Sequence, residues 1–308
     1  MVVLCNDQVG LNNRILCNFA PKIKPINIRN MKRVFLTALY LISCIGLFAQ
    51  TSAKSDQIQL VRSATLLIDY AGQKILLDPM LGPKGSLGSF SGKGVTPTTE
   101  LCVPISEIVE GLDLVLVTHA HIDHFDNKAI EVLDKKLKVL GQKEDKHVFL
   151  YNHFWNCDAV IDSIEHNGIT IIRTKAQHGT GRMLANMGEA SGFILKASNH
   201  PTIYIIGDGV WEQGIYDNIQ NYSPDYIVVN SGGAIVPGGY DATPIIMDER
   251  QVMALVQESR DIPVIAVHMD AVDHCRTTRE VLRNEAKKFN ISADKLIIPA
   301  DGEIITLH

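Results

Sequence analysis

The stretch LVLVTHAHIDHFD, residues 114–126, changes abruptly from apolar to ligand-type side chains. Its apolar half predicts a buried strand, and three histidines and two aspartates follow within eight positions. Residues two apart in an extended segment share a face, so His119, His121 and Asp123 can project to one side. Such side chains are costly to desolvate at a strand end unless they bind something charged. The H-x-H-x-D-H motif therefore predicts a metal site, because a solvated polar loop would not need three imidazoles.

The residues after the motif predict a helix over 127–137, with Asp126 or Asn127 as its N-cap. His124 lies at the turn into this helix. Further ligand-type residues follow apolar strands elsewhere in the chain, namely His178 after ITIIRT, Asp208 at the end of TIYIIGD and His268 at the end of VIAVH. A lone histidine at a strand end is more often a hydrogen-bonded surface group. The order and chemistry of the whole set favour a shared site.

The remaining pattern predicts the fold class. Apolar runs at 58–62, 64–70 and 74–79 predict an antiparallel meander. Strands and helices then alternate: strands are expected at 112–119, 147–151, 169–174, 192–197, 202–208, 225–230, 264–268, 295–300 and 303–308, and helices at 127–137, 248–259 and 277–289. This order predicts an α/β (α+β) fold, in which two mixed β-sheets pack face to face with helices outside.

Residues 81–100 form a long stretch rich in Gly, Pro and Ser. Their polarity predicts a loop that does not pack, and long loops in compact domains are often functional or disordered. A substrate lid and a plain mobile loop are both open interpretations.

The N-terminal region has the layout of a targeting segment. Lys32 and Arg33 precede an apolar run over 34–49, and a polar stretch follows. This predicts a signal peptide over 31–49, cleaved near Ala49, because a run of 16 residues is shorter than the ~20 that span a bilayer. Residues 1–30 are then an over-extended reading frame, with Met31 as the start in place of Met1; a disordered arm before an apolar anchor is the alternative.

Removal of the leader predicts an exported protein, periplasmic or secreted, with one domain over 50–308 and no stable membrane insertion. Cys44 ends a stretch that resembles a lipoprotein processing site, but the residues after it are still apolar. The 259 remaining residues include 23 basic and 33 acidic ones, a net charge of −10, which argues against a nucleic-acid partner. Cys102, Cys157 and Cys275 remain, so at most one disulfide is expected.

On its H-x-H-x-D-H motif and the later strand-end ligands, the sequence over 58–308 resembles the metallo-β-lactamase superfamily. The opening VRSATLLIDYAGQKILLDPML, residues 61–81, is similar to the branch that contains ascorbate-6-phosphate lactonase. The resemblance implies an αββα sandwich, in agreement with the strand and helix pattern.

The resemblance also implies a dinuclear metal centre. One ion would be bound by His119, His121 and His178, the other by Asp123, His124 and His268, with Asp208 bridging the two. Ligands of nitrogen and oxygen suit Zn²⁺, and also Mn²⁺ or Fe. Cys275 matches no ligand position of the family.

The activity implied is that of a metal-dependent hydrolase acting on a small ester, lactone, amide or phosphoester. Two ions roughly 3.5–4 Å apart lower the pKa of a bridging water toward ~7, and the resulting hydroxide attacks the substrate. Asp123 would orient that hydroxide and take its proton. Similarity to the lactonase branch favours a lactone or phosphoester over a β-lactam.

Several other residues are weaker candidates. His274 could donate a hydrogen bond to a developing oxyanion, and Arg276 and Arg279 could bind a carboxylate or phosphate; exposed charges at a helix start are the alternative. Asp78, at a strand end, could orient a ligand histidine. Trp211 fits either a pocket wall or the core.

Three other functions remain open. Related motifs hold iron, so an iron-dependent redox enzyme with sulfur or oxygen chemistry is the main alternative. Nucleic-acid processing conflicts with the net charge of the mature chain. A metal-binding module without catalysis would leave the complete ligand set unexplained.

Overall fold

The computed structural model describes residues 55–238 and 243–308, and its strands form two seven-stranded β-sheets. The predicted leader over 1–30 and signal peptide over 31–49 lie outside the described residues. No helix in the described ranges is long and apolar enough to cross a membrane.

The first sheet combines an antiparallel half with a parallel half. Its strands, in spatial order, are β14 (Ile304–Thr306), β1 (Gln57–Arg62), β2 (Thr65–Tyr70), β3 (Gln73–Leu77), β4 (Leu114–Leu116), β5 (Lys138–Gly141) and β6 (Cys157–Ala159). The pairings from β14 to β3 are antiparallel, as the meander predicted, and those from β3 to β6 are parallel.

The second sheet repeats this arrangement. Its strands, in spatial order, are β7 (Ser163–His166), β8 (Ile169–Ala176), β9 (Ala190–Lys196), β10 (Ile203–Ile205), β11 (Tyr226–Asn230), β12 (Val264–Val267) and β13 (Leu296–Ile297). Pairings from β7 to β10 are antiparallel and those from β10 to β13 are parallel. Each sheet therefore has one antiparallel half and one parallel half.

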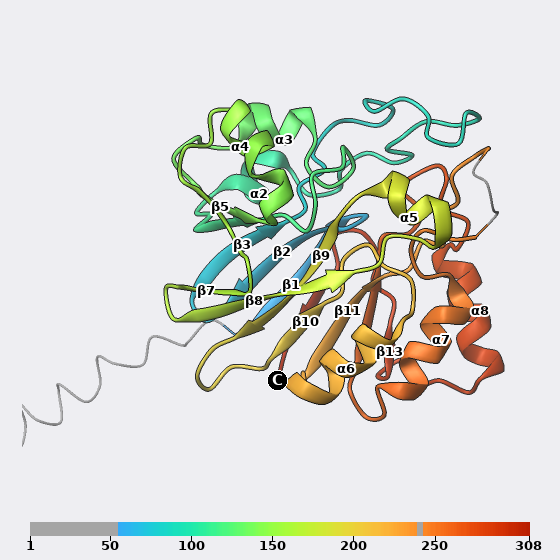
Figure 1. Ribbon diagram of the computed structural model, residues 1–308. Helices are drawn as coiled ribbons and strands as arrows, with labels where there is room; N and C mark the ends of the chain where they lie inside the picture. The colour runs from blue at the N-terminus through green and yellow to red at the C-terminus, as the bar shows by residue number, and fades with distance from the viewer. Residues whose placement is uncertain (1–54, 239–242) are drawn as a thin grey trace, which may run out of the picture. The chain divides into compact units, whose positions relative to one another are not determined.

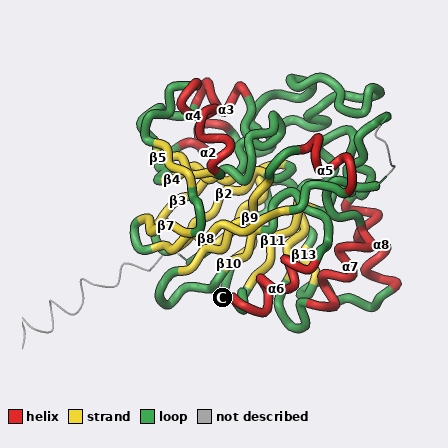
Figure 2. Tube along the Cα trace, viewed as in Figure 1, coloured by secondary structure: helices red, strands yellow, loops and turns green. Residues whose placement is uncertain are grey.

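Apolar residues fill the space between the sheets. Ile58, Leu66 and Leu116 of the first sheet pack with Phe193 and Val228 of the second, and all five are buried. Figures 1 and 2 show the two sheets in the centre with helices on both outer sides. The predicted sandwich of two mixed sheets with helices outside is confirmed.

The outer faces of the sheets are covered by separate groups of helices. Apolar residues of α2 (Ile105–Val109), α3 (Asn127–Val132) and α4 (Lys146–Tyr151) pack on the first sheet. The second sheet is covered by α6 (Gln213–Tyr222), α7 (Glu249–Glu258) and α8 (Arg279–Lys288). A short 3₁₀ helix, η1 (Lys143–Asp145), precedes α4, and α5 (Gly181–Met187) follows β8.

Of the two N-caps predicted for α3, Asp126 and Asn127, the structure has Asp126. Its carboxylate accepts a hydrogen bond from the backbone of Ala129. The strand predicted over 147–151 is wrong, because these residues form α4. Phe149 is fully buried against Phe125 while Tyr151 is exposed, so only one side of this segment contacts the core. A short apolar run does not distinguish a strand from a buried helix turn, and packing decides here.

The loop over 81–100 is held at both ends by one buried arginine, in contrast to the prediction that it does not pack. Arg62, at the end of β1, donates to the carbonyl oxygens of Met80 and Gly82 at 2.8 Å and of Thr99 at 2.9 Å. Its side chain is fully buried. The guanidinium therefore joins the two ends of the loop at its base, because one side chain bonds carbonyls on both sides of it.

We expect Arg62→Met to destabilise the protein by about 3 kcal/mol, since two buried carbonyls and one partly buried carbonyl lose a charged donor. Chemical denaturation monitored by circular dichroism measures the change. The matched control, Arg283→Met, removes an exposed arginine with one bond to Ile298, and should change stability by less than about 0.5 kcal/mol. Equal stability of the two variants would contradict this role of Arg62.

Candidate metal centre

The predicted ligands come from four strand ends that lie at one edge of the sandwich. His119, His121, Asp123 and His124 follow β4, and the other three follow β8, β10 and β12. β4, β10 and β12 belong to the parallel halves of the two sheets, whose carboxyl ends form the usual ligand-binding edge of such sheets. Residues up to 149 positions apart are thereby brought together.

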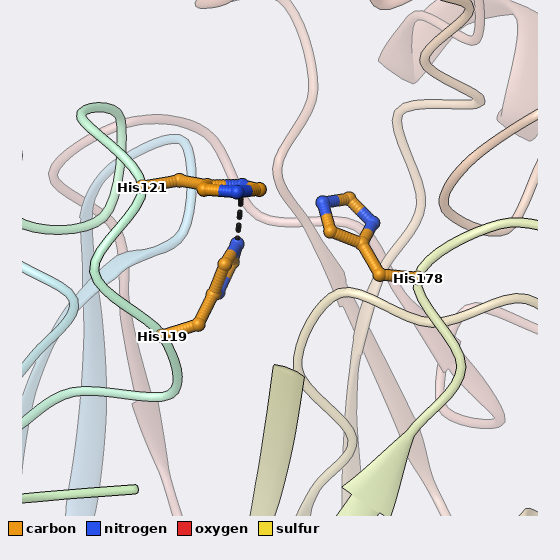
Figure 3. Close-up of side chains that lie close together, drawn as sticks. All are labelled: His119, His121 and His178. Carbon is orange, nitrogen blue, oxygen red and sulfur yellow. Dashed lines mark hydrogen bonds between the residues drawn. The ribbon is translucent and has the colours of Figure 1, made fainter. Parts of the chain in front are cut away.

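The first group consists of His119, His121 and His178. One ligand atom from each lies within 4.8 Å of the others. Figure 3 shows the imidazoles of His119 and His121 on one loop and that of His178 entering from another. His119 Nε2 and His121 Nδ1 are 2.9 Å apart. Burial lowers the pKa of all three imidazoles, which keeps them neutral with a free nitrogen lone pair.

The second group consists of Asp123, His124 and His268, again with one ligand atom from each within 4.8 Å. His124 Nε2 and His268 Nε2 are 3.3 Å apart. Burial opposes protonation of His124, but Asp208, Asp78 and Asp123 raise its pKa to about 10. If His124 and His268 were both protonated, their Nε2–H groups would point at each other across 3.3 Å. A cation between the carboxylates and the imidazoles removes that conflict, so the donors present fit a metal ion.

Asp208 lies between the two groups. Its Oδ2 is 3.3 Å from His124 Nε2 and 3.6 Å from His178 Nε2, and its Oδ1 is 3.8 Å from His268 Nε2. Burial alone would raise the pKa of this carboxyl, but the surrounding histidines, His124 foremost, hold it well below its usual value. The position and charge of Asp208 suit a ligand shared by two ions, as the family resemblance implies.

Hydrogen bonds from outside the ligand set fix the orientation of the histidines. Asp78 Oδ2 accepts from His124 Nδ1 at 2.9 Å, as its place at a strand end suggested. The same carboxylate accepts from the backbone and hydroxyl of Thr118, both at 2.7 Å. His178 Nδ1 donates to the carbonyl of Ile245 at 2.9 Å. Such contacts leave the other ring nitrogen free to bind a metal.

Asn230 is a further site residue that the sequence analysis missed. It ends β11, next to the strand that delivers Asp208, and its Nδ2 donates to Asp208 Oδ1 at 2.6 Å. The signal was present in DYIVVN, since Asn230 is a polar residue that closes an apolar strand as Asp208 and His268 do.

A cavity of about 260 Å³ opens over the ligands. Its floor includes His121, Asp123, His178, Asp208 and His268. The walls are formed by Phe90, Ile122, Met187, Ala234, Val236, Pro237 and Ile245, together with His274. No lysine or arginine lines it among the described residues, and the sequence analysis did not foresee these apolar walls.

His274, a weaker candidate from the sequence, lies at this cavity. Its Nδ1 is buried and has no hydrogen-bond partner, and its ring packs edge-on against Phe90 with centroids 5.4 Å apart. Burial lowers the pKa of His274. His274 is therefore a neutral imidazole on the cavity wall, and an imidazole has the chemistry to hydrogen-bond a substrate atom.

The other candidates lie outside the cavity wall. Arg279 forms ion pairs with Asp270 at 3.0 Å and with Asp301, and Arg276 is exposed, so neither lines the cavity. Trp211 packs against the apolar cluster under α6 and α7. Cys275 Sγ is 3.8 Å from His268 Nδ1, on the side of the ring away from His124. All three described cysteines, Cys102, Cys157 and Cys275, are free thiols.

Residues 57–268 match the model of the beta-lactamase superfamily domain, and the chain belongs to this superfamily. The UPF0173 protein YddR of Bacillus subtilis (strain 168) is 34% identical over 252 residues, which cover 80% of this chain and 98% of YddR. The crystal structure of a possible metal-dependent hydrolase from Veillonella parvula is 32% identical, with a TM-score of 0.78 over 82% of this chain and all of that one. Isothiocyanate hydrolase from Delia radicum gut bacteria is also 32% identical, with a TM-score of 0.76 over 82% of this chain and 99% of that enzyme. The class predicted from the sequence, a metal-dependent hydrolase, is confirmed.

We expect Asn230→Ala to weaken metal binding by about 10- to 100-fold, because Asp208 loses the donor that orients it. Competition with a chromogenic chelator measures the affinity. Asn218→Ala is the matched control, because it removes an amide of α6 that donates to the hydroxyl of Tyr204. This variant should bind metal like the unaltered protein. If both variants bind metal equally well, Asn230 has no part in the site.

Proposed function

We propose that the protein is a dinuclear metal-dependent hydrolase that acts on a small, uncharged substrate carrying an apolar substituent. The observation that carries this proposal is the cavity, which has ionisable ligands on its floor and apolar side chains on its walls. Its volume of about 260 Å³ is below the usual range for drug-sized ligands, which favours a small molecule.

The ligand residues divide into two sets that share Asp208. His119, His121 and His178 would hold one ion, and Asp123, His124 and His268 the other. Divalent ions held by these residues would supply Lewis-acid chemistry, by which a bound water has its pKa lowered to about 7. Ligands of imidazole nitrogen and carboxylate oxygen suit Zn²⁺, and also Mn²⁺ or Fe.

The chain's own residues then complete the chemistry. Asp123 faces the cavity as a carboxylate, so it can accept a hydrogen bond from the attacking water and take its proton. His274 is neutral, and an N–H of its ring can donate to the substrate oxygen that gains charge. The apolar walls lower the local dielectric constant, which strengthens both interactions.

The cavity lining discriminates among the predicted substrate classes. An ester, lactone or amide can be neutral and suits walls such as Phe90, Val236 and Ile245. A phosphoester carries a negative charge, and the described residues that line the cavity include no lysine or arginine to bind it. One relative is named isothiocyanate hydrolase, and an isothiocyanate is a small, uncharged electrophile of the kind this cavity favours. We therefore add isothiocyanates to the candidate substrates.

We expect neutral substrates to be hydrolysed with a kcat/KM at least about 100-fold above that for phosphodiesters, a difference of ~2.7 kcal/mol in transition-state binding. A panel of esters, lactones, amides, isothiocyanates and phosphodiesters tests this. Elemental analysis of the same preparation should give about two equivalents of Zn or Mn per chain. A preference for phosphodiesters would overturn the substrate proposal, and one equivalent of iron with oxygen consumption would favour the redox alternative.

We expect His274→Ala to lower kcat by about 100-fold, the cost of removing one donor to a developing oxyanion. The metal content should stay unchanged, because His274 belongs to neither ligand group. His147→Ala, at an exposed histidine on α4, is the control and should keep full activity. Unchanged kcat in His274→Ala would exclude this role.

A further inference from the structure

One segment of the long loop reaches the cavity, and we call residues 82–98 the strap. It follows β3 as the cyan loop at the top of Figure 1. Leu87 donates to the carbonyl of Thr96 and Gly85 to that of Pro97, both at 2.8 Å, so the two arms of the strap are paired. Between the arms, Phe90 contributes to the cavity wall.

One carboxylate holds the tip of the strap. Asp273 accepts hydrogen bonds from the backbone amides of Phe90 at 2.9 Å and Ser91 at 3.0 Å. It also accepts from the hydroxyls of Ser89 at 2.5 Å, Ser91 at 2.9 Å and Thr96 at 3.1 Å. Five donors from the strap therefore converge on a single side chain of the segment that follows β12.

Other hydrogen bonds hold the base of the strap. Gly82 donates to Asp126 Oδ2 at 2.6 Å, and Thr98 donates to the carbonyl oxygens of Asp270 at 2.5 Å and Ala271 at 2.8 Å.

Around the tip of the strap, apolar contacts are few. Leu87 and Phe90 are only partly buried, against a small cluster formed by Met80, Ala271 and Val272. Arg62 binds the loop near its ends and does not reach the tip. The conformation of the tip therefore depends chiefly on the bonds to Asp273, because the apolar contacts are few.

The same carboxylate is next in sequence to His274, whose ring contacts Phe90 edge-on. A shift of the strap would move Phe90 and thereby alter one cavity wall and remove the ring that supports His274. Asp273 therefore bonds the strap next to Phe90 and directly precedes His274. Both of these residues line the cavity, and Asp273 itself does not.

We propose that Asp273 is a positioning residue that fixes the strap, and that Phe90, held in this way, determines the size of the substituent the cavity accepts. The second part, a size limit on the substrate, rests on the proposed function. The geometric part, the fixing of the strap by Asp273, is independent of any substrate.

Asp273→Asn tests the geometric part, since the amide keeps the shape of the side chain but replaces one accepting oxygen with a donor. Hydrogen exchange followed by mass spectrometry on the full protein reports on the strap. We expect exchange at Phe90 and Ser91 to become about tenfold faster, the change for loss of one hydrogen bond to a charged group. Ser89→Ala/Ser91→Ala, which removes two hydroxyl donors and keeps the carboxylate, should give a smaller increase.

The size limit is tested by binding, so that the outcome does not depend on turnover. Calorimetry on the metal-loaded protein compares acetohydroxamic acid with benzohydroxamic acid, which chelate metals through the same group. We expect Phe90→Ala and Asp273→Asn to change the ratio of the two affinities by about threefold or more, which is ~0.65 kcal/mol. The affinity for the small probe should stay nearly constant, because the ligands are untouched.

Glu100→Gln is the matched control, because Glu100 accepts one bond from the backbone of Lys84 at the exposed base of the loop. It should change neither exchange nor the affinity ratio. Unchanged exchange in Asp273→Asn would overturn the positioning role. Faster exchange with an unchanged affinity ratio would overturn the role of Phe90 in size selection. Neither result depends on whether the substrate panel finds a turned-over compound.

Discussion

The structure depends on the convergence of two carboxylates and five imidazoles at one edge of the sandwich. Six of these seven side chains are buried, so their desolvation opposes folding unless opposite charge is present. Asp208 is the centre of this arrangement, because its oxygens approach histidines of both groups. The hydrogen bonds from Asn230 and to Asp78 fix the geometry that makes the charges compensate one another. The parallel halves of the two sheets bring these strand ends to one place.

Sequence patterns predicted the sheets and the ligand set because both follow local rules. Apolar runs that end in His119, Asp208 or His268 indicate buried strands with polar ends, and a parallel arrangement brings such ends together. Asn230 obeys the same rule, but its amide is a weaker signal than an imidazole or carboxylate because it acts here by a hydrogen bond to Asp208. The assignment of individual ligands stays a prediction, which the distances between their donor atoms support.

Features that depend on packing between distant segments could not be predicted. The run at 147–151 has strand-forming residues, yet it lies in α4, where Phe149 packs against Phe125. The loop over 81–100 is polar in composition, but its order comes from Arg62 and Asp273, which lie outside it. The apolar walls of the cavity come from several loops and from the end of α5. No local periodicity indicates which side chains of different loops will face each other.

The spread of the ligands along the chain has a consequence for how the site assembles. Its members extend from His119 to His268 and come from both sheets, so no short segment of the unfolded chain contains a complete set. Contacts of this range form late, because the loops between them must close before the contacts contribute. We therefore expect the metal centre to form after most of the fold and not to nucleate it. In this it differs from small zinc modules, in which the ion is bound within one short segment and drives that segment to fold.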